Sequence, residues 1–300
     1  MRVGPASGPL LIAAAAVLWG TTGTAQELGP ATSSPETVGA IRLAVGGAAL
    51  VVVAVALGRW RPAGPGWRLA ALATAAGVAL YQLTFFAAVS RTGVALGTVV
   101  AIGSAPILAA ILGRIVEGER MTRPWAGATG LALLGVALIA GAPGEADGVG
   151  IILALGAGAS YAIYATGSKR MLRSFPPLGA MAIGFGGGAV LLTPLLIGGD
   201  TSWLGDRGAW PMVLWLGIAT VGVAYVLFGY GLARTNVGTA ATISLAEPLT
   251  AALLGVVLLA ERPSALGWLG MAAVFAGLGL LAGFSGPART GRHKALPGRP

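Results

Sequence analysis

The chain has 300 residues, of which 56 % are hydrophobic and only 10 % are charged, and it contains no cysteine. Soluble proteins average about 25 % charged residues, so this composition excludes an ordinary soluble domain. The absence of cysteine excludes disulfides and thiolate metal sites. A formal net charge of +9 would suit a nucleic-acid partner only if the basic residues shared one surface.

Apolar runs of roughly 17 to 25 residues, the length that crosses a bilayer as a helix, recur along the whole chain. They predict an all-α polytopic membrane protein. Its ten transmembrane helices are expected at 10–28, 37–57, 68–89, 95–115, 125–141, 149–168, 177–198, 211–232, 238–260 and 267–284. The first run also has the pattern of a signal peptide, but the internal repeat described below needs it as a helix.

The Lys and Arg residues predict the orientation, because cytoplasmic loops of membrane proteins carry the excess of them. With residues 1–9 as a cytoplasmic amino terminus, fifteen of the nineteen lie on the cytoplasmic side, three lie outside and Arg42 lies within the second span. Residues 287–300 then form a disordered, basic cytoplasmic tail. We expect a multi-pass protein of the inner (cytoplasmic) membrane with both termini in the cytoplasm, and no nucleic-acid partner.

The two halves of the chain match at a constant shift of 142 residues. The shift pairs Trp19 with Tyr161, Pro106 with Pro248, Glu119 with Glu261, and Arg120 with Arg262. We therefore predict a first five-helix repeat at 10–141 and a second at 142–286. Since five is an odd number, the second repeat is inverted. Inverted repeats are common in transporters, where two half-bundles open a central site alternately to either side; the alternative is that the duplication merely builds a stable bundle.

Short motifs in both halves carry a family resemblance. They are Leu18-Trp19-Gly20, Ile41-Arg42-Leu43, Pro106 followed by Glu119, and Leu245-Ala246-Glu247-Pro248 followed by Glu261-Arg262. Together with ten spans and the repeat, they resemble the EamA-type transporters of the drug/metabolite transporter superfamily over nearly the whole chain. The resemblance implies a secondary transporter, often an exporter of amino acids or metabolites, with a central cavity and peripheral fifth and tenth helices. One departure is Tyr161, where many relatives have tryptophan.

The ninth predicted span carries a carboxylate near its middle, Glu247, followed at once by Pro248. An acid at the bilayer centre costs roughly 2.5 to 3.5 kcal/mol on insertion scales and usually marks a pathway or a site. The proline should bend the helix near Ser244, because it cannot donate a backbone hydrogen bond. Two interpretations stay open. Glu247 exchanges a proton or pairs with a substrate ammonium, or it bonds backbone groups freed by the proline or neutralises Arg42.

Arg42 either snorkels to the membrane interface or faces the cavity and binds a substrate carboxylate bidentately. In the second case, Arg42 and Glu247 could hold the two ends of an amino acid. The other residues of the predicted transport pathway are Trp19, Thr22 and Gln26 on one face of the first span, Tyr81 and Gln82, Tyr161 and Tyr164, Tyr225, Ser244 and Pro248. For each aromatic alone, packing or interfacial anchoring is the simpler explanation; as a group they indicate an aromatic, weakly polar cavity.

Other charged residues favour no other function class. The pairs Glu119-Arg120 and Glu261-Arg262 are interpreted as solvated helix ends. The single histidine, His293, lies in the predicted tail, so no histidine cluster for a membrane metalloprotease exists. Neither Lys169 nor Lys294 lies in a phosphate-binding loop of an ATP-driven transporter.

We therefore predict a secondary active transporter, an exporter of amino acids or small metabolites, with proton coupling through Glu247 as one mechanism. The alternatives are a passive channel-like facilitator and a membrane-embedded binding or scaffold protein. No enzyme activity, cofactor or metal is expected. The expected partners are a small-molecule substrate, the lipid bilayer and protons, and a monomer would suffice because one chain contains a complete passage.

Overall fold

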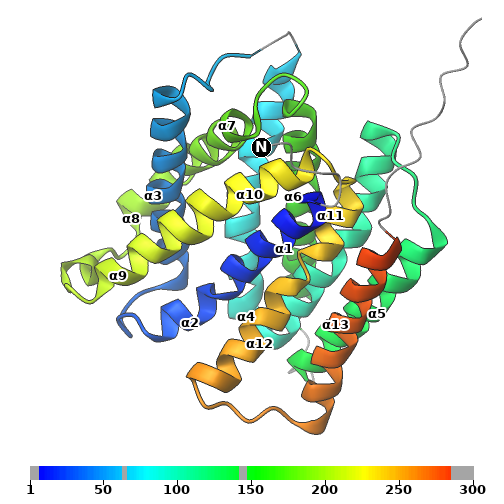
Figure 1. Ribbon diagram of the computed structural model, residues 1–300. Helices are drawn as coiled ribbons and strands as arrows, with labels where there is room; N and C mark the ends of the chain where they lie inside the picture. Colours follow the sequence, from blue (N-terminus) through cyan, green and yellow to red (C-terminus); the bar gives the residue numbers. More distant parts are fainter. Residues whose placement is uncertain (1–6, 63–65, 142–146, 285–300) are drawn as a thin grey trace, which may run out of the picture.

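The computed structural model describes residues 7–62, 66–141 and 147–284, and Figure 1 shows them as a bundle of helices. The helices are α1 (Ser7–Gly20), α2 (Thr22–Glu27), α3 (Pro35–Ala56), α4 (Trp67–Glu117), α5 (Arg123–Ala140), α6 (Gly148–Met171), α7 (Pro177–Leu191), α8 (Thr193–Gly198), η1 (Ser202–Gly205), α9 (Ala209–Leu214), η2 (Trp215–Val223), α10 (Ala224–Leu232), α11 (Val237–Ile243), α12 (Ala246–Leu258) and α13 (Ala265–Phe284). The expected tail at 287–300 lies outside the described residues.

The all-α membrane architecture is confirmed. Nine helical segments of the described chain are long and apolar enough to cross a membrane. The seventh expected span, 177–198, is the one that is not matched by a long helix, and it is formed by the shorter α7 and the short helix α8 that follows it. Pro194, in the first turn of α8, has no amide proton to continue the ladder of α7, which explains the interruption.

Local sequence signals explain several helix ends. The side chain of Ser34 accepts a hydrogen bond from the backbone N–H of Thr37 at the start of α3. Asp147 accepts one from the backbone N–H of Val149 at the start of α6. That bond, together with one from Arg91, holds the pKa of Asp147 below its ordinary value. These caps fix the residues at which α3 and α6 begin.

Helix α4 holds two predicted spans joined without a loop. Its direction changes at Gly93, which has φ of +79° and ψ of 162°. A residue with a side chain would be strained in that conformation, so glycine permits the sharp reversal there. The two parts of α4 correspond to the third and fourth spans, Trp67–Gly93 and Leu96–Glu117.

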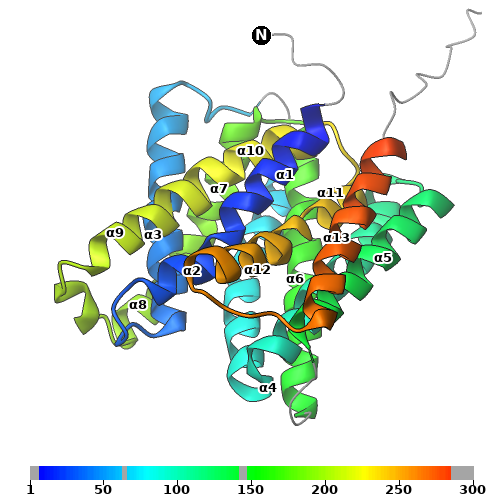
Figure 2. The same ribbon diagram turned by 60° about the horizontal axis from the view of Figure 1, so that its bottom comes forward.

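Helices α5 and α13, the last span of each repeat, form a pair at one side of the bundle in both views (Figures 1 and 2). Their backbones touch where both chains carry glycine. A Cβ on Gly135 would lie 2.6 Å from the carbonyl oxygen of Gly270, and a Cβ on Gly270 would lie 2.6 Å from that of Gly135. Small residues permit this close approach in membrane helices. The peripheral position that the family resemblance implies is thus observed.

At one end of the bundle, α4 and α11 cross in close contact. We call this end the basic end; α1 begins there, α4 ends there, and α10 turns into α11 there. Figure 2 shows the start of α1 and the end of α13 at this same end. A Cβ on Gly238 would lie 2.7 Å from the Cβ of Ala110, so α11 and the second part of α4 cross in close contact here. Buried residues crowd this end, among them Ile12, Met171, Leu232 and Val237.

Candidate transport site

A cavity of about 50 Å³, room for a few water molecules, lies between the two repeats. It is on the far side of the α4–α11 crossing from the basic end. Eight of the predicted pathway residues line it: Trp19, Arg42, Tyr81, Tyr161, Tyr164, Tyr225, Ser244 and Glu247. The remaining lining residues, Ala101, Ile102, Ala105 and Ala241, belong to α4 and α11. Both repeats therefore build the cavity wall.

Arg42 and Glu247 supply the charges of the cavity. Arg42 comes from α3 and Glu247 from the first turn of α12. They line the same cavity, yet no ion pair joins them in the described part of the chain. The Nε atom of Arg42 is buried and has no hydrogen-bond partner among the described residues. Arg42 thus lies in the wall of the cavity, as the second interpretation of this residue requires.

The ninth span breaks directly before Glu247. Helix α11 ends at Ile243 and α12 begins at Ala246. Pro248 cannot donate to the carbonyl of Ser244, and the backbone N–H of Glu247 donates to it instead, at 2.9 Å. The freed carbonyl is thus satisfied by the peptide group of Glu247. Within the described residues no donor is bound to its carboxylate, so the carboxylate is available to the cavity.

Aromatic rings from several helices form the rest of the wall. The ring centroids of Trp19 and Tyr225 are 4.9 Å apart, as are those of Tyr161 and Tyr164. The hydroxyls of Tyr161 and Ser244 share a hydrogen bond of 3.1 Å, which links α6 to the helix break. The indole Nε1 of Trp19 is buried without a partner in the described chain. The lining thus combines flat apolar faces with a few unused polar atoms.

A second, smaller cavity adjoins the first. Three predicted residues line neither of the two: Thr22, Gln26 and Pro248. The helical face expected to join Trp19 to Gln26 is interrupted, because α1 ends at Gly20 and the hydroxyl of Thr21 bonds the carbonyl of Leu18 at 2.7 Å. Gln26 donates to the carbonyl of Thr22 within α2. Pro248 acts through the backbone break, and Gln82 lines the smaller cavity with Arg42 and Tyr225.

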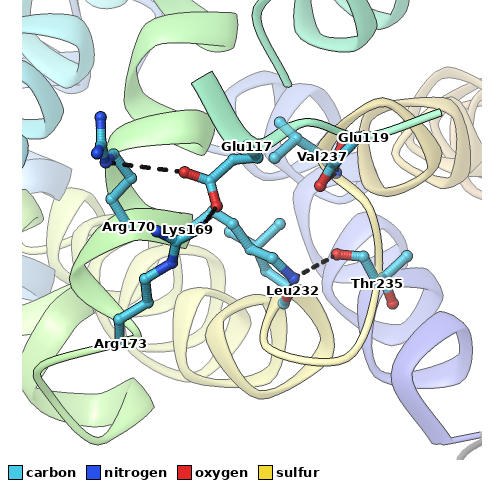
Figure 3. Close-up of polar contacts among 8 residues, drawn as sticks. All are labelled: Glu117, Glu119, Lys169, Arg170, Arg173, Leu232, Thr235 and Val237. Carbon is cyan, nitrogen blue, oxygen red and sulfur yellow. Dashed lines mark hydrogen bonds and ion pairs between the residues drawn. The ribbon is translucent and has the colours of Figure 1, made fainter. Parts of the chain in front are cut away.

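Charged side chains form a cluster at the basic end, which the sequence did not predict (Figure 3). Glu117 forms ion pairs with Arg170 at 3.8 Å and with Arg173 at 2.6 Å. The ammonium group of Lys169 donates to the carbonyls of Leu232 and Thr235, at 2.6 and 2.8 Å. These contacts tie the end of α6 to the end of α4 and to the turn after α10.

Glu119 was interpreted above as a solvated helix end, and the structure corrects this. Both of its carboxylate oxygens accept the backbone N–H of Val237, at 2.9 and 2.8 Å, so it reaches from the first repeat to the start of α11 (Figure 3). Burial raises its pKa above the ordinary value of 4.5, although the bond from Val237 acts in the opposite direction. The matching Glu261 in the repeat was the one signal that could have drawn attention to it.

Comparison with known proteins agrees with this architecture. The model of the EamA-like transporter family matches residues 6–141 and again residues 148–283. The chain belongs to this family. The two matches coincide with the two halves of the bundle, so this EamA protein is built from two family repeats, as the sequence shift predicted.

Relatives of this EamA chain are named as transporters. It is 42 % identical over 271 residues to the "Uncharacterized transporter YwfM" of Bacillus subtilis (strain 168), which covers 90 % of this chain and 91 % of that protein. It is 29 % identical over 247 residues to a "Probable terminal-alkyne amino-acid exporter" of Streptantibioticus cattleyicolor, with 80 % of this chain and 81 % of that one covered. A solved crystal structure shares the fold, with a TM-score of 0.79 at 23 % identity over 91 % of this chain and 96 % of that one.

Proposed function

We propose that this EamA-family protein is a secondary active transporter that exports an amino acid, or a metabolite with the same two charged groups, across the cytoplasmic membrane by alternating access. One observation carries the proposal. A partly buried cation and a partly buried anion, Arg42 and Glu247, line a single cavity between two inverted repeats without pairing with each other in the described chain. A zwitterionic solute offers the complementary pair.

The two charges would recognise the two ends of the solute. The planar guanidinium of Arg42 suits a carboxylate, because its donors match both carboxylate oxygens. The carboxylate of Glu247 suits an ammonium group, and a cation beside Tyr or Trp faces gains further from the negative face of the ring. Trp19 and Tyr225 provide such faces in the same cavity. The aromatic rings also give the side chain of the solute an apolar surface to cover.

Glu247 also supports coupling to protons. A carboxylate in the membrane interior is costly when it is charged and unpaired. When the substrate ammonium leaves, a proton is the simplest replacement for it. Proton and substrate would then compete for one group, and this competition is sufficient to exchange one for the other as the cavity alternates. Exchange against an inward proton gradient would drive export, the direction printed in the name of the relative from Streptantibioticus cattleyicolor.

The test is transport in proteoliposomes, screened over amino acids with and without a pH gradient. We expect saturable uptake, counterflow and stimulation by the gradient. Glu247→Gln should lose the response to pH, and Arg42→Ala should raise the half-saturation concentration by about tenfold, the loss expected when a charged hydrogen-bond donor is removed. Two matched controls are Glu27→Gln and Arg91→Ala, because both side chains are exposed at a bundle end. Both controls should transport like the parent protein.

Each result separates this proposal from its alternatives. Flux without saturation or counterflow would identify a channel-like facilitator. Saturable flux that ignores the pH gradient in the parent protein would remove proton coupling and leave the carrier. Unchanged transport in both Glu247→Gln and Arg42→Ala would show that the substrate binds elsewhere.

A further inference from the structure

The contact of Glu119 with α11 is built into the backbone of the first repeat. The backbone N–H of Glu119 donates to the carbonyl of Gly113 at 3.2 Å, which folds the end of α4 back on itself. A Cβ on Gly113 would lie 2.6 Å from a carboxylate oxygen of Glu119, so glycine leaves the space that the carboxylate occupies. From there the carboxylate reaches the backbone N–H of Val237, the first residue of α11.

The second repeat contains the same device at the opposite end. Gly255 and Glu261 lie 142 residues after Gly113 and Glu119. The backbone N–H of Glu261 donates to the carbonyl of Gly255 at 3.0 Å, and its carboxylate likewise lies where a Cβ of Gly255 would be. Two glycines and two acids thus form a matched pair, related by the inverted repeat.

Only one member of the pair is engaged in this structure. Glu119 is partly buried and bonded to α11, whereas Glu261 is exposed and no hydrogen bond from the described chain reaches its carboxylate. The counterpart of Val237 in the first repeat lies just after Gly93, at Ala95, where the second part of α4 begins. The repeat symmetry therefore makes the backbone N–H groups at that point the possible partners of Glu261, although no such bond is found within the described part of the chain.

The engaged acid lies at the end where α4 and α11 cross in close contact. At the basic end α11 touches the second part of α4, at Gly238 and Ala110. The cavity begins beyond this crossing, where Ala105 of α4 and Glu247 of α12 face it. The engaged acid therefore lies at the closed end, and the free acid lies at the end toward which the two segments diverge.

From this we infer that Glu119 and Glu261 are reciprocal latches. Glu119 holds the basic end closed by binding the N–H of Val237, and in the opposite state it lets go while Glu261 binds the N–H groups that follow Gly93. This inference rests on the proposed alternating transport, and it assigns the closing contact of each state. Neither acid touches the substrate. They set which side of the bundle is closed.

The absence of native cysteine permits a direct test of closure. Ala241→Cys places one thiol in the cavity wall next to the α4–α11 crossing. Inside-out membrane vesicles, in which the basic end is expected to face the medium, are treated with a membrane-impermeant thiol reagent. Adding Glu119→Ala should raise the rate of modification about tenfold, a shift typical of the coupling between two states. Glu119→Gln should stay near the parent rate, because its amide oxygen still accepts the N–H.

A second substitution removes the donor of the bond between Val237 and Glu119. Val237→Pro deletes the N–H but suits the first position of a helix, and Asn236 before it already has φ of −65° and ψ of 149°. It should raise the modification rate as much as Glu119→Ala, and the two together should do no more than either alone. Glu117→Gln is the matched control, since it neutralises a neighbouring acid that pairs with α6 instead of α11; it should leave the rate unchanged.

The decisive result is reversal. Glu261→Ala added to Glu119→Ala should bring the modification rate back toward that of the parent, because both states then lose one latch. If Glu119 only stabilised the fold, adding Glu261→Ala at the other end would not restore the modification rate of the Glu119→Ala variant. If Glu119→Ala and Val237→Pro leave the rate unchanged, or if Glu261→Ala does not reverse it, the inference is wrong. Thiol accessibility needs no substrate, so a failed transport screen with intact reversal would reject only the proposed substrate.

Discussion

The crossing of α1 and α12 beside Glu247 should tolerate no added methyl group. Gly20 is buried at the end of α1. In Gly20→Ala, the new Cβ would lie 2.5 Å from the Cβ of Thr250 and 2.7 Å from the carbonyl oxygen of Glu247. Ordinary van der Waals contact begins at 3.4 Å, so the two helices must separate by about 0.7 to 0.9 Å. Neither obstacle is the flexible end of a side chain, and the backbone must therefore move.

The size of the effect follows from two opposing contributions. Overpacking of this kind costs about 1 to 3 kcal/mol. Replacing glycine by alanine in a helix returns up to about 1 kcal/mol, and less at a helix end. A net loss of about 1 kcal/mol should lower the melting temperature by about 2 to 4 °C for a chain of this size class. Because the displaced backbone belongs to Glu247, we also expect weaker substrate binding.

Gly23→Ala is the matched control, because it lies three residues further along and a Cβ there would meet nothing within 4 Å. It should melt at or slightly above the temperature of the parent protein. The measurements are thermal unfolding in detergent and the half-saturation concentration in proteoliposomes. Should Gly20→Ala melt as high as Gly23→Ala and transport with the same half-saturation, the rigid crossing inferred here does not exist.

Three further predictions concern other contacts. Lys169→Met keeps the aliphatic stem but removes the ammonium donor from the carbonyls of Leu232 and Thr235, of which the first still accepts the backbone N–H of Thr235, so it should destabilise the protein by about 2 kcal/mol, measured by thermal unfolding. Gly135→Ala should lower the melting temperature, whereas Gly130→Ala on the same helix should not, since only the first meets backbone of α13. Burial, and then the nearby charge of Glu117, raise the pKa of Glu119 where it is bonded to α11, while the bond from Val237 and the charge of Lys169 lower it. If this state is the closed one, as inferred above, acidification toward pH 4.5 should favour closure of the basic end. Since the reactive thiolate also becomes scarcer in acid, the modification rate is divided by the rate of the Glu119→Gln variant at the same pH, and this ratio should fall on acidification.

The membrane architecture could be predicted because it depends on long-range averages of the sequence. The ten apolar runs and the shift of 142 residues are recognised from many positions at once, so misreading one residue does not change the prediction. The break at Ser244 could also be predicted, since the missing amide proton of Pro248 acts on a neighbouring turn. Such local backbone effects need no knowledge of the partners of the helix.

The face of the first span could not be predicted in the same way. Helical periodicity places Trp19, Thr22 and Gln26 together only if the helix is continuous. One turn tightens at Thr21, where both the backbone N–H and the side-chain hydroxyl bond the carbonyl of Leu18, three residues back, so α2 does not continue the face of α1. The role of Glu119 was hidden for another reason, because its partner Val237 is 118 residues away. A charged residue at a helix end usually faces solvent, and no periodicity reveals the exception.

Comparing the two repeats separates the residues that both halves share from those that only one half carries. The shared residues are Pro106 with Pro248 and Glu119 with Glu261. Even the shared prolines act differently, because α4 continues through Pro106 whereas the helix breaks between α11 and α12 before Pro248. The unshared residues break the symmetry. Glu247 corresponds to Ala105, so only one half carries the carboxylate of the cavity. Lys169 corresponds to Glu27, so in the second repeat a cation binds the carbonyls of Leu232 and Thr235 where the first repeat has an acid. Two states related by symmetry would be equal in energy. If the protein alternates as proposed, the extra cation favours closure of the basic end when the cavity is empty, and a substrate that binds more tightly to the opposite state must supply the free energy to reverse it.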